Sequence, residues 1–577
     1  MVRIRQVEIK HFRSIRSLSW YPQPGLNCLV GPGDSGKSTI LDAIDLCLGA
    51  RRTVSFADTD FYGLDVSQPI VISLTLGDLP DRLKNLDYYG DCLRGYDDKI
   101  LGVVLDEPCK DCETVITVRL TVSSDLEPVW SLYSERVEHL DPPKSLQWRD
   151  RVELAPSRLG QHSTSNLSWT RGSVLNRLGE ERATVGPALV HAAREARATF
   201  GAQAGPQLAK TLEAVTRTAK DLGIPVGASA TALLDAHSAS FGDGAVSLHS
   251  DNGIPLRSMG TGSTRLLIAG LHRATANSAG IVLIDEVEHG LEPHRINRLL
   301  DSLGAKDKEE PLQVFMTSHS PVVLRELSGS QLSIVRSSAA GHTVRALGSG
   351  DDVQAALRMF PEAFLAKAVL VCEGASEIGL IRGLDQYWTK QGFPSLQAAG
   401  VSYIDVGGGD ADRAFKRANA FLGLGYKVAV VQDNDKPPTE LAVQGFLSQG
   451  GALFSWRDGL ALEDELFLSL PATEVTALIA RAQELTEDGR VNDHLGTKSN
   501  GRVKLADVLA EGASGEYSLE TRRLLGLSSR IRNAGWFKSI TKMSGVAHDI
   551  VGPSLKGVAP EFRELVLGPI RWARSNA

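Results

Sequence analysis

The sequence Gly31-Pro-Gly-Asp-Ser-Gly-Lys-Ser-Thr39 constrains the fold of this 577-residue chain more than any other stretch. It matches the phosphate-binding pattern G-x-x-x-x-G-K-[ST], and it lies between the apolar run 26–30 and a predicted helix over 40–48. Glycines let backbone N–H groups turn toward phosphates, Lys37 can reach the β- and γ-phosphates, and the Ser38 hydroxyl can bind Mg²⁺. We therefore expect an ATP site; the alternative is a glycine-rich turn without a ligand. The residues expected to contact the nucleotide are Gly31, Gly33, Ser35, Gly36, Lys37, Ser38 and Thr39.

The overall charge does not indicate a nucleic-acid-binding protein, because the formal total is −7 at pH 7. The charge is unevenly distributed, however, and segment 521–577 holds ten Lys or Arg residues against three Asp or Glu residues. A basic segment on an acidic protein is typical of a local binding site for a polyanion. A solvated helical face has the same composition, and charge alone leaves both interpretations open.

Cysteine usage and hydropathy indicate a protein of a reducing compartment. Six cysteines in this length provide no disulfide framework, and Cys109-Lys-Asp-Cys112 has no second pair at zinc-like spacing. We expect this pair to lie in a hairpin and to bind no metal. Residues 2–5 form a charged, alternating strand and not a signal peptide, and no apolar run is long enough to cross a membrane. The cytoplasm is the expected location.

Hydrophobic periodicity predicts an α/β protein with a helical insertion. Strands surround the P-loop helix, although segment 141–168 has the composition of an irregular connection. Apolar residues then recur at helical spacing before the β/α pattern returns, and a hairpin is expected over 332–346. The expected parts are an ATPase domain in two pieces (1–183 and 238–350), the helical insertion (184–237), a connector (351–367) and a second α/β domain (368–577).

Ile281-Val-Leu-Ile-Asp-Glu286 has the form of a Walker B strand. Its apolar residues suit a strand buried in a parallel sheet. Asp285 at the end of the strand would hold Mg²⁺, and Glu286 would orient or activate the attacking water. This pattern is common and usually structural when it stands alone, but a P-loop in the same chain favours the functional interpretation.

Two further segments fit a nucleotide site that a partner completes. Ser258-Met-Gly-Thr-Gly262 opens a predicted helix, so Ser258 and the Gly260 amide could bind an anion, or the segment could be a plain helix cap. His319 directly follows a predicted strand and could reach the γ-phosphate, or it could be an ordinary loop histidine.

The order of these four elements resembles that of an ABC-type ATPase head. Residues 9–15 before the P-loop and 286–293 after the Walker B strand also resemble the corresponding segments of SMC and RecF heads. One departure is Gly33-Asp34, where these heads often have Asn-Gly. In such families two heads enclose ATP, with the signature segment of one head completing the P-loop site of the other. The resemblance therefore implies a homodimer, and we place its permanent contacts in the helical insertion.

The second α/β domain carries carboxylates at the predicted ends of its strands. Glu373 and Glu377 follow the apolar strand 368–372, and Asp433 and Asp435 follow strand 427–431. Carboxyl ends of parallel strands face one crevice, where uncompensated carboxylates would repel one another unless cations bind. Two Mg²⁺ or Mn²⁺ ions about 4 Å apart would fit and would support in-line phosphodiester cleavage. Ordinary polar loops are the alternative.

This arrangement of carboxylates resembles the Toprim domain of topoisomerases, primases and some nucleases. Glu463 offers a further carboxylate as a ligand of the second metal, although its neighbours could be solvated helix charges. The resemblance also implies a lysine that stabilises the transition state. Lys538 in Gly-Trp-Phe-Lys is our choice and Lys542 is the alternative; either could instead contact the phosphate backbone or be solvated.

An ABC-type head followed by a Toprim domain resembles the overcoming lysogenization defect family over essentially the whole chain. The resemblance implies a dimeric, ATP-regulated DNA endonuclease that uses one Mg²⁺ with ATP and two metal ions at the Toprim site. Members act in phage defence, some beside a UvrD-like helicase as in Gabija systems, and a role in DNA repair is also open. One alternative is a non-catalytic, ATP-switched DNA-binding or repair scaffold of the RecF or SMC type. Another is a topoisomerase- or primase-like enzyme, for which no tyrosine or template module has a supporting motif.

Overall fold

The computed structural model describes residues 2–51, 53–97, 102–159, 191, 195, 199, 209–221, 251, 256–274, 280–307, 312–338 and 340–577. The chain forms two compact units. One contains Met1–Cys28 and Ser38–Ser318, and the other contains Leu29–Lys37 and His319–Ala577. Within the described ranges, none of the helices combines the length and the apolar character needed to cross a membrane.

The first sheet is antiparallel and has the strand order β2-β1-β4-β7-β5-β6, with β8 also paired to β7. On β1, Ile4, Val7, Ile9 and Phe12 are buried, as expected for a strand with one face on a core. The strands are β1 (Arg3–Phe12), β2 (Ile15–Trp20), β4 (Ile70–Gly77), β5 (Leu93–Asp97), β6 (Val103–Leu105), β7 (Glu113–Val122) and β8 (Pro128–Tyr133).

The second sheet contains the strand that leads into the P-loop and has the order β13-β12-β3-β11-β10-β9. Every residue of β3, β10 and β11 is buried, which accounts for their largely apolar sequences. The predicted hairpin is confirmed as antiparallel β12 and β13. The strands are β3 (Leu26–Val30), β9 (Ser157–Leu159), β10 (Ile281–Ile284), β11 (Gln313–Thr317), β12 (Leu332–Ser338) and β13 (Gly341–Ala346).

The expectation of an irregular connection over 141–168 is wrong for part of that segment. Helix α3 (Trp148–Leu154) forms there, and β9 pairs in parallel with β10 at the sheet edge. Three residues are too few to show an alternating pattern, so β9 left no periodic signal. Its Arg158 forms ion pairs with Asp42 and Asp45 of the P-loop helix, which fixes the strand beside that helix.

The predicted helices of the ATPase region are present. Only α6 and three single residues of the expected insertion 184–237 are described; the rest of the insertion lies outside the described residues. The helices are α1 (Lys37–Leu48), α2 (Leu86–Tyr89), α6 (Ala209–Asp221), α7 (Thr261–Ala274), α8 (Pro293–Ser302), α9 (Pro321–Glu326) and α10 (Asp351–Met359).

Cys109 and Cys112 differ from the expectation in two ways. They form a disulfide, with their Cα atoms 5.2 Å apart, because the turn that bonds the Cys112 N–H to the Cys109 carbonyl brings the two residues together. Their loop joins β6 to β7, which lie on opposite sides of β5, so it is not a hairpin turn. The other four cysteines are free and buried.

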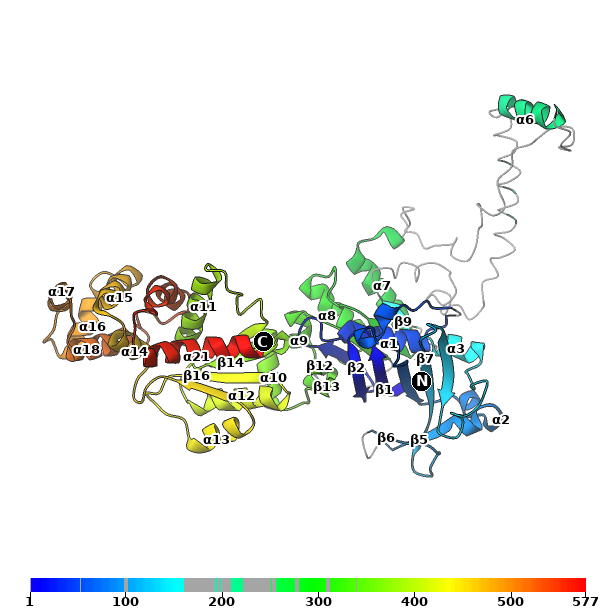
Figure 1. The fold of residues 1–577 in the computed structure, drawn as a ribbon, viewed down its shortest axis with the longest axis horizontal. Coiled ribbons are helices and arrows are strands. Elements are labelled where there is room, and N and C mark those ends of the chain that lie inside the picture. The colour runs from blue at the N-terminus through cyan, green and yellow to red at the C-terminus, as the bar shows by residue number, and fades with distance from the viewer. Residues whose placement is uncertain are drawn as a thin grey trace. The chain divides into compact units, whose positions relative to one another are not determined.

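The C-terminal sheet is parallel, with the order β15-β14-β16-β17. Helices α11 and α21 lie on one face and α12 and α13 on the other (Figure 1). This layered α/β sheet is the one expected for a Toprim domain. Its elements are β14 (Ala368–Cys372), α11 (Ala375–Thr389), β15 (Val401–Asp405), α12 (Asp412–Gly423), β16 (Lys427–Gln432), α13 (Glu440–Ser448), β17 (Ala452–Ser455) and α21 (Pro560–Asn576).

A cluster of helices follows the sheet, and the basic C-terminal segment is helical as predicted. Its core includes Trp536 and Phe537, both fully buried, with the Trp536 ring edge-on to Phe467. The helices are α14 (Leu462–Ser469), α15 (Ala472–Leu485), α16 (Arg490–Ser499), α17 (Leu505–Ala513), α18 (Leu519–Ser529) and α19 (Ile540–Val546), which continues as a π-helix (Ala547–Val551) and α20 (Gly552–Ser554).

The hairpin strand β12 contacts both the P-loop and the start of β16. The Val335 carbonyl lies so close to Gly31 that a Cβ at residue 31 would be 2.7 Å from the oxygen. The guanidinium of the next residue, Arg336, lies 3.7 Å from the ring centroid of Tyr426. The Tyr426 hydroxyl in turn donates to the Phe364 carbonyl at 2.7 Å. One extended strand therefore ties the phosphate loop to the C-terminal sheet.

Candidate functional site

The P-loop forms a cradle whose centre is the Lys37 ammonium. Lys37 is 5% exposed, and its Nζ donates to the carbonyls of Gly31 and Pro32 and to Ser35 Oγ at 2.7–3.2 Å. Gly31 and Gly36 have positive φ angles, which only glycine adopts without strain. Gly33, Ser38 and Thr39 keep some exposure at the mouth of the loop. The P-loop residues predicted to contact the nucleotide therefore lie together in one loop around the Lys37 ammonium.

A hydrogen bond joins the P-loop serine to the Walker B aspartate. Ser38 Oγ donates to Asp285 Oδ1 at 3.0 Å, and Thr317 Oγ1 donates to the same oxygen at 2.6 Å. Ser38 and Asp285 are the two residues predicted to bind the same Mg²⁺. Glu286 follows with a φ of 47°, a strained conformation that is common at active sites, and its N–H donates to Thr317 Oγ1 at 2.8 Å.

Arg265 of α7 is a residue that the sequence patterns did not single out. It is almost fully buried, and its Nη1 donates to the carbonyls of Glu286 and His289 at 2.8 and 3.1 Å. Burial lowers the pKa of Arg265, and the charges of Glu288, Glu286 and Asp285 oppose that effect. Arg265 therefore holds the loop that carries Glu286. A single arginine in a predicted helix carries no motif by which it could have been found.

In the signature segment, residues 258–262, the cap of α7 is Gly260 and not Ser258. Ser258 ends a short 3₁₀ turn, and Gly260 is the residue whose carbonyl caps α7, accepting from Thr264 N at 3.1 Å. Ser258 and Gly260 are both exposed. His319 is also exposed, directly after β11.

Four of the predicted metal ligands gather at the carboxyl ends of β14 and β16. Asp433 N donates to Glu373 Oε2 at 3.0 Å, which joins the two strand ends. Leu462 N donates to Asp433 Oδ1 at 2.9 Å, and this bond brings the start of α14 to the same place. Glu463 on that helix accepts from Ser376 Oγ of α11 at 3.3 Å, next to Glu377.

Electrostatic repulsion marks these carboxylates as one cluster. Burial raises the pKa of Glu377 to about 8, and the charges of Glu463 and Glu373 add to the effect. Burial also raises the pKa of Asp433 well above its usual value, again with Glu377, Glu463 and Glu373 contributing. Glu377 and Glu463 are only 3% and 4% exposed. A cluster in which carboxylates repel one another in this way fits divalent cations.

Asp435, the fifth predicted ligand, is bound to an arginine. Arg530 Nη1 lies 2.6 Å from Asp435 Oδ2, and Arg530 Nη2 lies 3.1 Å from Asp464 Oδ2. Asp464 is 5% exposed and also accepts from Ala461 N at 3.1 Å. Neither Arg530 nor the buried position of Asp464 was predicted, because the pairing joins residues far apart in the sequence.

The two candidate lysines occupy different surroundings. Burial raises the pKa of Glu373 and of Glu463, and the positive charge of Lys538 opposes both rises, so its ammonium is close enough to act on these two carboxylates. Lys542 Nζ instead donates to the Leu485 carbonyl at 3.1 Å. The loop before Lys538 is anchored by Trp536, whose Nε1–H donates to His494 Nδ1 at 3.0 Å.

The donor chemistry of the cluster fits Mg²⁺ or Mn²⁺, which prefer carboxylate oxygens. Among the described residues, no three such side chains already enclose a single point as the ligands of one ion do. Binding would therefore require carboxylates to turn toward a common position. Glu373 and Asp433 lie at strand ends and are half-buried, not fully enclosed.

Two family models match the chain. Residues 26–325, just over half of the chain, match the family described as "AAA domain, putative AbiEii toxin, Type IV TA system". Residues 364–435 match the family described as "Overcoming lysogenization defect protein-like, TOPRIM domain". The first range contains the P-loop and the Walker B strand, and the second contains Glu373, Glu377, Asp433 and Asp435.

Similar curated proteins match only short stretches. The DNA replication and repair protein RecF of Chlorobium phaeovibrioides is 39% identical over 57 residues, which are 10% of this chain and 15% of RecF. The chromosome partition protein Smc of Methanocaldococcus jannaschii is 39% identical over 64 residues, which are 11% of this chain and 6% of Smc. This chain therefore spans a small part of the length of these relatives.

Similar solved structures include SMC heads. An Smc head from Pyrococcus furiosus, bound to the C-terminal domain of ScpA, has a TM-score of 0.33 and 15% identity, covering 60% of this chain and 96% of that chain. The SMC head domain from Thermotoga maritima has a TM-score of 0.28 and 14% identity, covering 60% of this chain and 98% of that chain.

Proposed function

Because this chain belongs to the AAA ATPase family and carries the Toprim domain of the overcoming lysogenization defect family, we propose that it is an ATP-regulated, divalent-metal-dependent DNA endonuclease or nickase. The family assignment agrees with the resemblance found in the sequence and makes the chain a nuclease-type enzyme with nucleotide and metal use. The observation that carries the finer proposal is the buried carboxylate cluster at the ends of β14 and β16, with Lys538 beside it.

The roles follow from the positions of the side chains. Glu373, Glu377, Asp433 and Glu463 would hold two Mg²⁺ or Mn²⁺ ions, with Asp435 as a further ligand if it leaves Arg530. When bound, the ions would supply positive charge to the attacking and leaving oxygens of a phosphodiester. Lys538, which is exposed and close to Glu373 and Glu463, would stabilise negative charge that develops on the phosphate.

The ATPase half supports a switch driven by nucleotide. Lys37 would bind the β- and γ-phosphates, while Ser38 and Asp285 would hold one Mg²⁺. Glu286 would orient the water, and His319 would approach the γ-phosphate. Ser258 and Gly260 would complete the site of a second copy, which makes a homodimer part of the proposal.

DNA is the proposed substrate, and the basic segment 521–577 would contact its backbone, so binding should weaken as salt rises. A role in anti-phage defence or DNA repair in the cytoplasm is consistent with this chemistry. We leave a UvrD-like helicase partner out of the proposal, because neither the described residues nor the matched families point to one.

Plasmid nicking by single variants tests the proposal. Glu373→Ala should lose cleavage by orders of magnitude while ATP turnover stays near wild type. Lys538→Ala should keep Mn²⁺ binding, measured by calorimetry, and lose cleavage. Lys542→Ala is the matched control, because that lysine bonds the Leu485 carbonyl. If Lys538→Ala cleaves DNA and Lys542→Ala does not, the role in stabilising the transition state belongs to Lys542.

The ATP site needs a separate measurement. Lys37→Ala should abolish tight ATP binding, whereas Glu286→Gln should bind ATP and hydrolyse it slowly. Unchanged turnover in Glu286→Gln would remove the role given to that carboxylate.

A second candidate is a non-catalytic DNA-binding scaffold, favoured by the short similarity to RecF and Smc. A scaffold has no need for four carboxylates that raise one another's pKa at a strand end. Wild-type nicking by Glu373→Ala, or no nicking by the wild type with Mg²⁺ or Mn²⁺, would favour the scaffold.

A further inference from the structure

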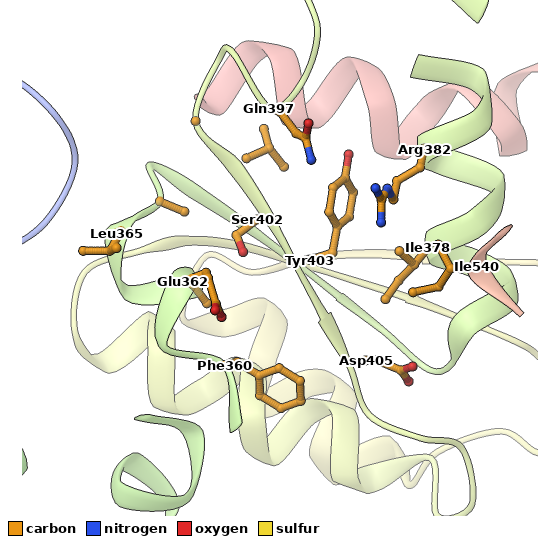
Figure 2. Close-up of a pocket in the computed structure, with 14 residues that line it drawn as sticks. Phe360, Glu362, Leu365, Ile378, Arg382, Gln397, Ser402, Tyr403, Asp405 and Ile540 are labelled. Carbon is orange, nitrogen blue, oxygen red and sulfur yellow. The ribbon is translucent and has the colours of Figure 1, made fainter. Parts of the chain in front are cut away.

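A cavity of about 510 Å³ opens along β15, the edge strand of the Toprim sheet (Figure 2). The strand itself forms one wall. Helix α11 contributes Arg382 and Ile378, the segment before β14 contributes Glu362, and Ile540 comes from the start of α19. No role assigned above uses this cavity.

An unpartnered hydroxyl lies in the cavity. The Tyr403 oxygen is buried and has no hydrogen-bond partner among the described residues. Figure 2 shows the ring extending between Gln397 and Arg382. Burial raises the pKa of Tyr403, so its hydroxyl stays protonated and can donate a hydrogen bond at neutral pH. A buried donor without an acceptor is unfavourable unless a ligand satisfies it.

The cavity offers an anionic ligand one guanidinium, that of Arg382, although the carboxylates Glu362 and Asp405 also line it. Its two carboxylates are already engaged: Glu362 lies 3.5 Å from Arg325, and Asp405 Oδ1 accepts from Gly407 N at 2.8 Å. Arg382 is half-buried, and within the described part of the chain it has neither an ion pair nor a hydrogen bond. A guanidinium and a neighbouring hydroxyl that is uncovered by a small side-chain movement are suited to the oxygens of a phosphate.

The cavity is next to the carboxylate cluster. Arg382 lies five residues after Glu377 on α11, which is about 7.5 Å along the helix axis and about 140° around it. Asp405 is in register with Cys372, the residue before Glu373, and Ile540 is two residues after Lys538. Since neighbouring nucleotides of a stacked strand rise about 3.4 Å, this spacing corresponds to about two nucleotides.

A second cavity of about 550 Å³ extends the first. It shares Arg382, Gln397 and Ile540 with the first cavity and adds Lys390 and His548. The lining Asp385 is engaged with Leu396 N at 3.0 Å. The two cavities adjoin at these shared residues, and this path is lined by Arg382, Lys390 and His548 together with the carboxylates of Glu362, Asp385 and Asp405.

We propose that this path binds the substrate strand and that Arg382 and the Tyr403 hydroxyl hold a backbone phosphate about two nucleotides from the bond that is cut. The inference rests on the proposed nuclease function and adds a binding subsite to it. Arg382 and Tyr403 position the strand and take no part in the chemistry. Gln397, an amide with both donors and an acceptor, can adapt to the sugar or to a bridging water.

Neutral-linkage scanning tests the subsite. Oligonucleotides with one methylphosphonate, moved one step at a time from the cut site, are bound in Ca²⁺ and separately cleaved in Mn²⁺ by full-length protein. For the wild type, the neutral linkage near the second step should weaken binding and kcat/KM about tenfold, the usual effect of one charge-assisted hydrogen bond. Arg382→Gln should bind the normal strand about tenfold more weakly and be insensitive to the linkage there.

Tyr403→Phe and Arg413→Gln complete the design. Tyr403→Phe removes only the hydroxyl, so a folded variant with weaker strand binding supports the subsite. Arg413 is an exposed arginine on α12, on the opposite face of the sheet, and its variant should behave like the wild type. Wild-type scanning profiles in both Arg382→Gln and Tyr403→Phe would overturn the inference.

Two further outcomes separate the hypotheses. The first outcome concerns inorganic phosphate. If phosphate raises the Tm of the wild type but not of Arg382→Gln, and Arg382→Gln binds oligonucleotides as the wild type does, the cavity binds a free anion. That result would overturn the strand subsite. A wild type that fails to cleave would overturn the proposed function. In that case, loss of Ca²⁺-supported binding in Arg382→Gln would still support a phosphate site, and unchanged binding would overturn it.

Discussion

Arg530 binds Asp435, with 2.6 Å between Nη1 and Oδ2, although Asp435 was predicted from the sequence as a metal ligand. The same guanidinium reaches Asp464 with its other nitrogen. An arginine thus supplies positive charge at one margin of the cluster. A cation that recruits Asp435 has to compete with Arg530 for that carboxylate.

Arg530→Gln should therefore change stability and metal binding in opposite directions. The buried Asp464 loses its counter-ion, which should cost the metal-free protein about 2 kcal/mol. Mn²⁺ should bind more tightly, because a competing charge is gone. Thermal melts with and without Mn²⁺ check this, and Arg532→Gln, an exposed neighbour, is the control. Equal Mn²⁺ affinity in both variants would show that Arg530 does not compete.

Asp34 should weaken ATP binding. It is exposed in the P-loop with a φ of 57°, a conformation that aspartate tolerates at some cost and glycine adopts freely. Its negative charge also belongs to the loop that is proposed to hold phosphates. Asp34→Asn should tighten ATP binding a few-fold by removing the charge. Asp34→Gly should add up to about 1 kcal/mol of stability by removing strain. Fluorescent-nucleotide titrations and melts separate the two effects; identical affinities in all three proteins would argue against the charge effect.

The carboxylate cluster should make the metal-free protein less stable at alkaline pH. The pKa of Glu377 is raised to about 8 from an ordinary value of 4.5, so the folded protein retains a proton that the unfolded chain releases. Stability is then greatest below about pH 4.5 for this group and falls as pH rises toward 8, by about 2 kcal/mol between pH 6 and 8. Thermal melts of the metal-free protein at pH 6 and pH 8 check this. Added Mg²⁺, or the substitution Glu377→Gln, should reduce the difference in Tm between the two pH values. A metal-free Tm that rises over this range would contradict the assignment.

His494 should give the opposite dependence at acid pH. Burial lowers the pKa of His494 below 6.5, and the neutral ring accepts the indole N–H of Trp536. A lowered pKa stabilises the fold above about pH 6.5, and this contribution is lost as pH falls through the folded value. His494→Ala should leave the buried N–H of Trp536 without an acceptor and cost about 1–2 kcal/mol. Denaturant titrations at pH 7.5 and 5.5 check this; a variant with the wild-type acid dependence would exclude His494 as the cause.

Deletion of residues 184–237 should convert the protein to a monomer. Within this segment the structure describes α6, where Thr216 is buried and Leu212 half-buried. The small apolar residues predicted for its face suit a self-complementary contact. Light scattering reports the mass, and retained ATP binding shows that the head remains folded. A deleted protein that keeps the dimer mass would locate the interface elsewhere.

The sequence predicted the chemistry of the sites better than their surroundings. The P-loop, the Walker B strand and the carboxylates at strand ends could be located because each motif lies within a few consecutive residues, and a parallel sheet brings its strand ends together. Arg265, Arg530 and Asp464 could not be found, since each acts through partners that are distant in the sequence. Strand β9 was missed because three residues are too few to show an alternating pattern. The disulfide of Cys109 and Cys112 was missed because it depends on the turn between them.

The contact between Arg336 and Tyr426 limits how the protein can be divided for study. A fragment that starts at residue 368 would contain Tyr426 but would lack Arg336 above its ring and the Phe364 carbonyl that its hydroxyl binds. It would therefore begin with an uncovered aromatic surface at the base of β16, the strand that leads to Asp433. A longer fragment that starts before Leu332 would keep both contacts, and it is the piece in which the proposed nuclease chemistry could be measured apart from the rest of the chain.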